Sequence, residues 1–329
     1  MYGDQVITIE KNTITATTST NIVMSCKLSH NCSHVVKFNK NSISTYNNEF
    51  LCAAMEHDKK IFDNIYNYIV FYALRDMFTP DSVTVSQFYN SFNNCVSDFI
   101  EFFKACSPET RQTIIYDHIC FNHDAKMRGV ISLSTYVGYN AFCVARCNNC
   151  PGAICEYCYA NSLTKQRFFL KMKLIRIMAI FTNIELQPDD IPVLDSELYP
   201  FFRFEGFGDL NNTLQFANYN LFARVNSGVN CTIWTKNPGI IQAAINAGLL
   251  LSNNLIIGLS SLYLNTPEID KAKKYSFIRF LFTVYDDDYI KEHNIVINCG
   301  ARHCLTCGIC YKYLHEYKNG LYIINERKK

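Results

Sequence analysis

From residue 129 onward, segments typical of β-strands alternate with segments typical of α-helices, and this alternation constrains the fold more than any other feature. Six short runs rich in β-branched and aromatic residues are separated by amphipathic stretches, and the runs are residues 129–135, 200–206, 230–235, 254–261, 277–285 and 294–298. Alternation at this spacing indicates parallel β-α-β units. We therefore expect an α/β fold built on a parallel sheet, and six units suit an open or partial (β/α)6 barrel.

The N-terminal part of the chain has a different character. Residues 1–46 are rich in Thr, Ser and Asn with short β-type runs, whereas residues 47–120 place apolar residues at the three- and four-residue spacing of helices. Pro80 interrupts this helical pattern. The sequence therefore predicts a mainly helical N-terminal extension, a barrel and a C-terminal cysteine-rich segment, with bounds 1–125, 126–298 and 299–329.

The composition argues against several classes of protein. The net charge of the 329-residue chain is +2, so nucleic acid or an acidic membrane is not indicated as a partner. No apolar run reaches the ~18 residues of a membrane-spanning helix. The first twelve residues lack the basic and then apolar regions of a secretion signal. We therefore expect a cytoplasmic protein with no membrane partner.

Sixteen cysteines without a secretion signal favour metal ligands or catalytic thiols over a disulfide scaffold. Nine of them form two clusters. The first cluster contains Cys143, Cys147, Cys150, Cys155 and Cys158. The second contains Cys299, Cys304, Cys307 and Cys310. We expect the seven scattered cysteines to be small buried apolar residues.

The second cluster has the spacing C-x4-C-x2-C-x2-C, which supplies four thiolates within twelve residues. Four thiolates complete a tetrahedral zinc site, and four also hold a [4Fe–4S] cluster. The spacing alone does not decide between the two metals. We expect one closed metal site here, which fastens the last strand to a C-terminal helix.

The first cluster follows the first predicted strand of the barrel, at the end of the sheet where function is usual. Cys155, Tyr157 and Cys158 form a C-x-aromatic-C unit that resembles the latter half of the radical S-adenosylmethionine (SAM) signature, C-x3-C-x-aromatic-C. Pro151 stands where the first cysteine of that signature falls. A [4Fe–4S] cluster that is held by only three cysteines has one iron open to bind substrate or cofactor. This spacing therefore suggests a catalytic site.

The third ligand of the first cluster comes from Cys143, Cys147 or Cys150. These three form a C-x3-C-x2-C triplet of their own, but Asn149 occupies its aromatic position. That departure favours the unit at Cys155 over the triplet.

A resemblance to a family covers residues 129 to about 315. The stretches SLST, CPGAICEYCYA, RFEGFGD, IWTKNP, FTVYD and INCGARHCLTCGICY are similar, in the same order, to the radical-SAM-like phage "gene product 88" family and its bacterial relatives. Relatives of this type use a cysteine after an Asn-x-x element, which matches Asn140 and Cys143, followed by C-x2-C-Tyr-Ala, which matches Cys155 to Ala160. The resemblance therefore favours Cys143, Cys155 and Cys158 as ligands, with Cys150 as the alternate to Cys143.

The resemblance implies an iron–sulfur enzyme of a bacterial or phage-infected cell. Its first site takes a [4Fe–4S] cluster and S-adenosylmethionine, and its second takes [4Fe–4S] or zinc. Reductive cleavage of S-adenosylmethionine to a 5′-deoxyadenosyl radical requires an electron donor, and the radical acts on an unknown substrate. The alternative is a non-catalytic zinc- or iron–sulfur-binding protein with a structural or interaction role.

The resemblance also assigns cofactor-binding roles to residues after the second strand. In radical SAM enzymes an acidic glycine-rich turn holds the amino group of methionine, and Gly208 and Asp209 occupy that place. Asp209 is also suited to cap the following helix. Arg203 and Glu205 alternate with phenylalanines, so we expect both on the interior face of the strand, either binding cofactor or forming a structural pair.

Three further candidates lie near the ends of other elements. Lys236 could meet the carboxylate of the cofactor as a point charge or lie in a solvated loop. Ser260, with its neighbour Ser261, ends the fourth predicted strand. Tyr157 lies beside the first cluster and is a candidate contact for the adenine.

Overall fold

The structure is a computed structural model of the chain. It describes the backbone of five strands between residues 6 and 47, together with residues 96–97, 99–122, 126–138, 140–143, 153–160, 163, 168–300, 303–312 and 321–328. The chain divides into two compact units, residues 1–104 and residues 105–329.

The first unit contains a five-stranded antiparallel sheet in which each strand pairs with the next along the chain. Its strands are β1 (Val6–Glu10), β2 (Thr13–Thr17), β3 (Val23–Lys27), β4 (Ser33–Phe38) and β5 (Ser42–Asn47). They lie in the segment where the sequence indicates short β-type runs. The helices that the sequence predicts between residues 47 and 95 lie outside the described residues.

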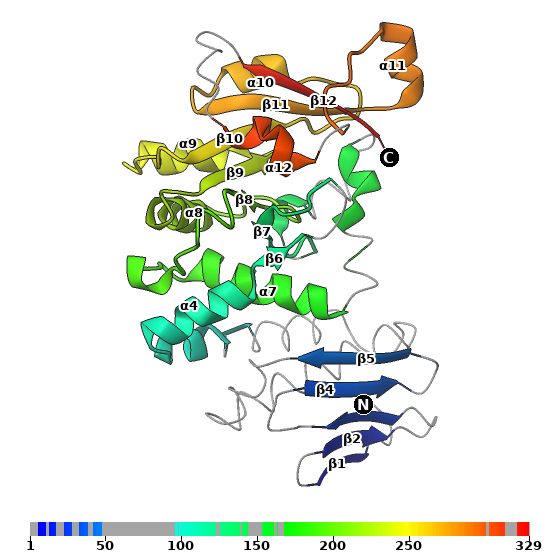
Figure 1. The fold of residues 1–329 in the computed structure, drawn as a ribbon, viewed down its shortest axis with the longest axis vertical. Coiled ribbons are helices and arrows are strands. Elements are labelled where there is room, and N and C mark those ends of the chain that lie inside the picture. The colour runs from blue at the N-terminus through cyan, green and yellow to red at the C-terminus, as the bar shows by residue number, and fades with distance from the viewer. Residues whose placement is uncertain are drawn as a thin grey trace. The chain divides into compact units, whose positions relative to one another are not determined.

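The second unit is an α/β structure with a seven-stranded, mostly parallel sheet in the order β12-β11-β10-β9-β8-β7-β6 (Figure 1). Strands β7 to β12 run parallel to one another, and β6 joins the edge antiparallel to β7. The strands are β6 (Cys120–Phe121), β7 (Ile131–Leu133), β8 (Phe201–Phe204), β9 (Asn230–Thr235), β10 (Leu255–Ser260), β11 (Ile278–Tyr285) and β12 (Tyr322–Arg327). The α/β class is confirmed, and β7 to β11 fall within five of the predicted runs.

The sixth parallel strand is not the predicted one. Residues 294–298 form no strand, and Val296 among them is 76% exposed. The sixth strand is β12, which follows the second cysteine cluster at the place where the sequence predicts a helix. Its residue Ile324 is buried against β11, whereas Asn298 is exposed and lies beside β12, where its backbone amide donates to the Asn325 carbonyl and its side-chain amide to the Ile323 carbonyl. Burial of an apolar side chain in the sheet core therefore decides between two similar local patterns.

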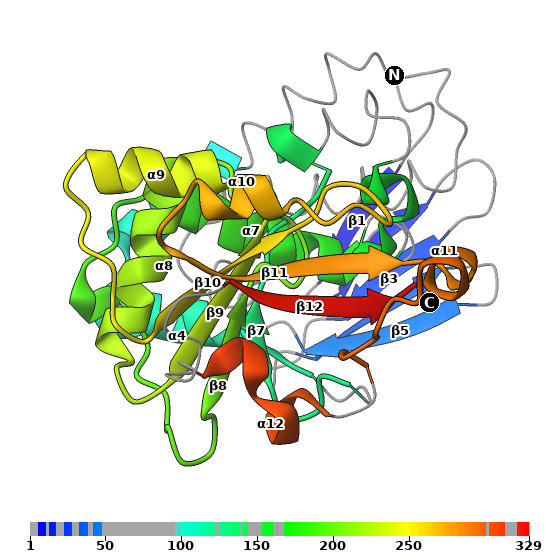
Figure 2. The same ribbon diagram turned by 90° about the horizontal axis from the view of Figure 1, so that it is seen from above.

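The helices that connect the parallel strands lie on one face of the sheet. They are α7 (Phe168–Asn183), α8 (Thr213–Val225), α9 (Pro238–Asn246) and α10 (Ile269–Lys273), whereas α11 (Asp287–His293) lies beyond the carboxyl end of β11 and buries none of its residues (Figure 2). Because the strand order never reverses and parallel crossovers are right-handed, successive helices are placed on the same side. Figure 2 shows α8, α9 and α10 on one side of the strands and the short helix α12 (Cys304–Cys307) on the other.

Two different cores cover the two faces of the sheet. On the helix-covered face, Phe204 of β8 stacks on Tyr219 of α8 with ring centroids 4.3 Å apart. The opposite face carries none of the helices α7 to α10, and we call it the helix-free face. On it, Trp234 packs against a buried cluster of Ile256, Phe280, Phe282 and Ile324. The 3-10 helix η4 (Ile309–Tyr311) covers this face over β9 and β10. The two cores anchor the sheet from both sides.

One buried histidine lies beside the helices of the second unit. His118 follows α4 (Pro108–Asp117), and its Nδ1 lies 2.6 Å from the Ile114 carbonyl oxygen. Burial, reinforced by the nearby Arg176 cation, lowers its pKa from 6.5 to about 3. The imidazole is therefore neutral at physiological pH.

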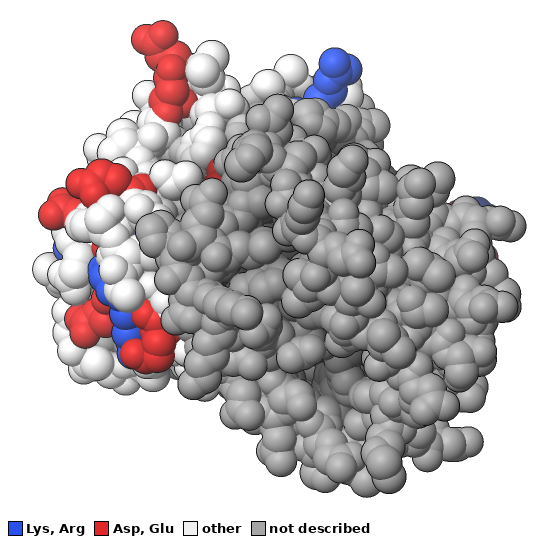
Figure 3. All heavy atoms as spheres, turned by 90° about the horizontal axis from the view of Figure 1, so that it is seen from below, with Lys and Arg blue, Asp and Glu red and all other residues white. Residues whose placement is uncertain are grey.

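The outer surface of the described chain is mixed in charge. In the face shown in Figure 3, described acidic and basic side chains lie side by side at the lower left, whereas an acidic group at the top and a basic side chain at the upper right stand apart. No helix in the described ranges has the length and apolar character needed to cross a membrane.

Candidate functional site

The carboxyl ends of β7, β8, β9 and β10 meet at one edge of the sheet, because neighbouring parallel strands end on the same side. The loops that follow β8 and β9 carry Glu205, Gly208, Asp209 and Lys236. Each candidate after the second strand thus lies at the edge where the topology places function.

Glu205 is buried on the helix-covered side of the sheet and does not share a face with Arg203. Its φ is +54°, so the extended backbone of β8 ends there and strand alternation no longer applies. Its carboxylate, 3% exposed, accepts hydrogen bonds from Thr135, Gln215 and Tyr219. The expectation that Arg203 and Glu205 point to one interior face is therefore wrong. Burial raises the pKa of Glu205 to about 8.

Arg203 lies instead on the helix-free face. The carbon at the centre of its guanidinium lies 4.0 Å from the ring centroid of Trp234, and one terminal nitrogen lies 4.0 Å from the sulfur of Met127. No described ion pair joins Arg203 to Glu205. This position is next to the second cysteine cluster, because Arg203 acts electrostatically on Cys304 and Cys310.

Gly208 has no room for a side chain. Its φ is +87°, and a Cβ atom there would lie 2.4 Å from the Thr135 hydroxyl oxygen and 2.5 Å from a carboxylate oxygen of Glu205. Only glycine combines this backbone conformation with such a close approach. Gly208 therefore allows the loop after β8 to close over Glu205.

Asp209 joins the loop after β8 to the loop after β9. One carboxylate oxygen accepts from the Thr235 hydroxyl and the Leu210 amide, and the other accepts from the Lys236 amide at 2.8 Å. The side chain is 2% exposed, so burial raises its pKa while the Lys236 cation opposes the rise. The capping interpretation is wrong, because Asn212 is the residue that caps α8.

Asn140 links the first cysteine cluster to Asp209. Its side-chain amide donates to the Asp209 carbonyl at 2.6 Å, and its side-chain oxygen accepts from the Cys143 amide at 3.0 Å. Burial raises the pKa of the Cys143 thiol; Asp209 adds to the rise, Lys236 opposes it, and Cys155 and Glu205 add to it. Cys143 therefore lies within electrostatic reach of the acidic and basic candidates of this edge.

The second part of the cluster is fastened across the same edge. Cys155 belongs to the 3-10 helix η2 (Ile154–Tyr157), and the Cys158 amide donates to the Cys155 carbonyl at 3.2 Å. The Ile154 amide donates to the Leu262 carbonyl beyond β10 at 2.8 Å, and the Tyr159 hydroxyl donates to the Gly206 carbonyl beyond β8 at 2.6 Å. The cysteine loop thus spans the ends of β8 to β10.

Some candidate residues of the first cysteine cluster are not among the residues that the structure describes. Cys147, Cys150 and Pro151 are not among the described residues, and of Tyr157 only the backbone is described. The choice of Cys143 over Cys150 and the contact of Tyr157 with adenine therefore stay predictions.

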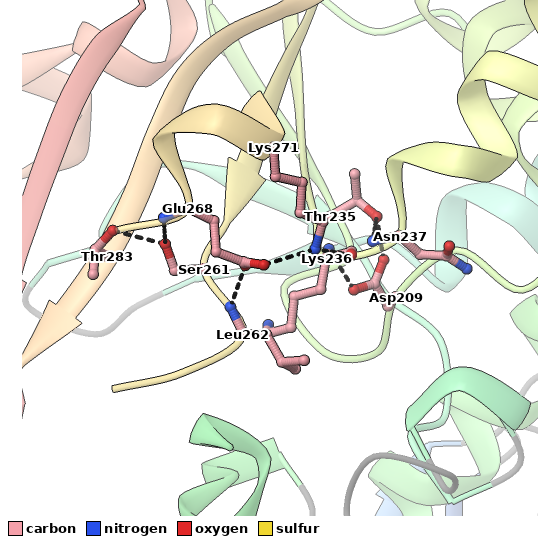
Figure 4. A network of polar contacts seen from close by, with 9 residues as sticks. All are labelled: Asp209, Thr235, Lys236, Asn237, Ser261, Leu262, Glu268, Lys271 and Thr283. Atoms are coloured by element: carbon pink, nitrogen blue, oxygen red, sulfur yellow. Dashed lines mark hydrogen bonds and ion pairs between the residues drawn. The ribbon is translucent and has the colours of Figure 1, made fainter. Parts of the chain in front are cut away.

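A polar network continues from Asp209 across the loops after β9 and β10 to Thr283 of β11 (Figure 4). The Lys271 ammonium lies 3.4 Å from the Lys236 carbonyl oxygen and 3.0 Å from the Glu268 carboxylate. Glu268 in turn accepts from the Leu262 amide at 2.7 Å, so it orients the loop that holds η2. Glu268 and Lys271 escape sequence analysis, because a three-residue acid–base spacing is also typical of an exposed helix turn.

The two serines take different positions in this network. Ser261 shares a hydrogen bond of 2.8 Å with the Thr283 hydroxyl and accepts from the Glu268 amide at 3.3 Å. Ser260 ends β10 and is 9% exposed. Ser261 is thus committed to loop structure.

The second cysteine cluster lies on the helix-free face of the sheet. Cys299 and Cys310 pack against the apolar cluster around Phe280, and Cys304 and Cys310 pack against the cluster of Val130, Phe201 and Tyr311. The Cys304 amide donates to the Lys126 carbonyl at 2.8 Å, and the Lys126 ammonium pairs with Glu326 of β12. The segment therefore joins β12 and the entry to β7.

The described His, Cys, Asp and Glu side chains form no group of three with the geometry to hold a metal ion. Thiol sites often close only when metal binds, because binding and local folding are coupled. Metal ligation at either cluster therefore stays a prediction. No family model, curated protein or solved structure matches this chain.

Proposed function

We propose that the protein is a radical SAM-type iron–sulfur enzyme built on a partial (β/α)6 barrel. The observation that carries the proposal is the position of the first cysteine cluster: Cys143, Cys155 and Cys158 are held over the carboxyl edge of β8 to β10, beside Asp209 and Lys236. The strand order of β7 to β12 supports the barrel, because it never reverses and the helices α8 to α10 all lie on one face of the sheet (Figure 2).

The residues present fit an iron–sulfur cluster in their chemistry. Thiolates are the ligands of such clusters, and three of them leave one iron site open. A cysteine must lose its thiol proton to bind the cluster, and burial raises the pKa of the Cys143 thiol. Assembly of the cluster therefore releases protons and is favoured at alkaline pH. The chemistry that a bound cluster supplies is one-electron cleavage of S-adenosylmethionine, with an external electron donor and an unidentified substrate.

The protein's own groups bind and orient the cofactor in this proposal. Lys236 is half-buried and supplies a positive charge for the carboxylate of S-adenosylmethionine. Asp209 fixes the backbone of Lys236 and keeps one lone pair of its second oxygen for the amino group. Gly208 lets the turn that carries Asp209 pack directly against Thr135 and Glu205.

One observation favours a second function, a non-catalytic metal-binding role. Asp209 and Glu205 each accept at least three hydrogen bonds from the protein itself, so both have a complete structural task without a ligand. Metal analysis separates the two functions, because an enzyme of the proposed type needs iron and sulfide whereas a purely structural site is satisfied by zinc.

Protein purified without oxygen should be brown and contain iron and acid-labile sulfide. Cys155→Ser should lose the iron of the first site, about four atoms per chain, because one of its three thiolates is removed. Cys120→Ala is the matched control, since Cys120 lies in the edge strand β6 and belongs to neither cluster. Colourless wild-type protein with stoichiometric zinc and no sulfide would refute the enzymatic proposal.

A further inference from the structure

Four buried polar atoms on the helix-free face have no hydrogen-bond partner in the described structure. They are Arg203 Nε, Thr232 Oγ1, Trp234 Nε1 and the Tyr311 hydroxyl oxygen. All four groups can donate a hydrogen bond, and Arg203 also carries a permanent positive charge. A buried donor without a partner costs free energy, so four together indicate a partner that binds at this face.

These donors form one group. Arg203 and Thr232 are register partners in neighbouring strands, and the Arg203 guanidinium lies 4.0 Å from the Trp234 ring centroid. Phe201, two residues before Arg203 on the same face, stacks on Tyr311 with centroids 4.9 Å apart. The residues thus surround the place where the second cysteine cluster covers the sheet.

Three thiols of that cluster pack on the same face. Cys310 contacts both apolar clusters, one shared with Cys299 and Trp234, the other with Cys304 and Tyr311. Two cations flank the thiols: Arg203 acts on Cys304 and Cys310, and Lys126 acts on Cys299 and Cys304. The site therefore provides positive charge and unpaired donors next to groups that become negative when they bind metal.

We propose that Cys299, Cys304, Cys307 and Cys310 hold a redox-active iron–sulfur cluster rather than zinc, with the unpaired donors of the helix-free face as partners for its inorganic sulfides. A zinc site brings no acceptors beyond its four thiolates, and zinc is not reduced. An iron–sulfur cluster brings sulfide acceptors and gains a further negative charge on reduction, which Arg203 offsets. This inference goes beyond the proposed function and does not depend on the first site.

The test removes the first site. A Cys143→Ala, Cys155→Ala, Cys158→Ala triple variant, reconstituted anaerobically with iron and sulfide in the presence of zinc, should retain about four iron and four sulfide per chain. Zinc without sulfide would overturn the inference. A second measurement uses the single variant Cys307→Ser, in which the first site is intact. This variant should contain less iron and less sulfide than the wild type, and loss of zinc alone would again overturn the inference. Both measurements report on the second cysteine cluster even if the first cysteine cluster binds no iron.

Arg203 acts as a positioning residue, and its effect is measured as a change in the reduction potential of the iron–sulfur cluster. One electron passes from dithionite, which is oxidised to sulfite, to the cluster. Arg203→Gln in the triple variant should lower the equilibrium constant for this reduction about tenfold, or ~59 mV for a one-electron couple. Arg327→Gln, which removes a cation that is 61% exposed, should leave the potential unchanged.

A second substitution guards against loss of folding. Trp234→Phe keeps an aromatic ring under Arg203 and removes one unpaired N–H, so it should lower the potential in the same direction by less. Equal potentials in the Arg203→Gln, Trp234→Phe and Arg327→Gln proteins would overturn the role of these donors.

Discussion

Asp209→Asn should destabilise the protein by about 2–4 kcal/mol, because it leaves a buried donor facing a donor. Asp209 is 2% exposed, and its two oxygens accept from Thr235, Leu210 and the Lys236 amide. An asparagine keeps one oxygen, but its NH₂ group must face an N–H or O–H of this set. The nearby Lys236 cation also loses the negative charge of this carboxylate. The free energy of unfolding in urea measures the effect.

Asp195→Asn is the matched control for this substitution. Asp195 also accepts from two backbone amides, those of Glu197 and Leu198, but it does so in an exposed loop. Water satisfies the new NH₂ group there, so the change should stay within about 0.5 kcal/mol. Similar small losses at both positions would show that Asp209 is not the junction between the loops after β8 and β9.

Raising the pH from 6.5 to 8 should lower the free energy of unfolding by about 2 kcal/mol through Glu205 alone. Burial raises the pKa of Glu205 from 4.5 to about 8, so the folded state holds this proton more tightly than the unfolded chain. Stability from this group is complete below pH 4.5 and is lost as pH rises through about 8. The pKa of His118 is lowered from 6.5 to about 3, so this group destabilises the folded state as pH falls below 6.5. It does not contribute to the change between pH 6.5 and 8.

Glu205→Gln tests the assignment of this pH dependence. Glutamine keeps the size of the side chain and does not titrate, so the variant should show nearly equal unfolding free energies at pH 6.5 and 8. Parallel urea titrations of both proteins at the two pH values give the comparison. An unchanged pH dependence in the variant would assign the effect to another group.

The parallel strands could be predicted because each is a short β-branched or aromatic run between helices. The run in β10, LIIGLS, is buried along its whole length, as expected of a strand covered on both faces. The last strand could not be predicted in the same way. Residues 294–298 and β12 have similar local patterns, and only the packing of Ile324 against Phe280 and Phe282 separates them.

The sequence predicts the position of a candidate residue correctly where the order and direction of the strands alone decide it. Gly208, Asp209 and Lys236 follow strand ends, and parallel strands bring those ends together. Side-chain direction was not predictable at Glu205, because alternation assumes an extended backbone and the φ of +54° ends it. Lys271 was missed because its link to the Lys236 carbonyl joins loops that are distant in sequence.

The most direct test of the proposed function is the fate of S-adenosylmethionine. Protein reconstituted with iron and sulfide, reduced with dithionite and kept without oxygen should convert it to 5′-deoxyadenosine and methionine. Cys155→Ser should form no 5′-deoxyadenosine, and Cys120→Ala should match the wild type. Intact S-adenosylmethionine after incubation with wild-type protein that carries its full iron and sulfide would contradict the account.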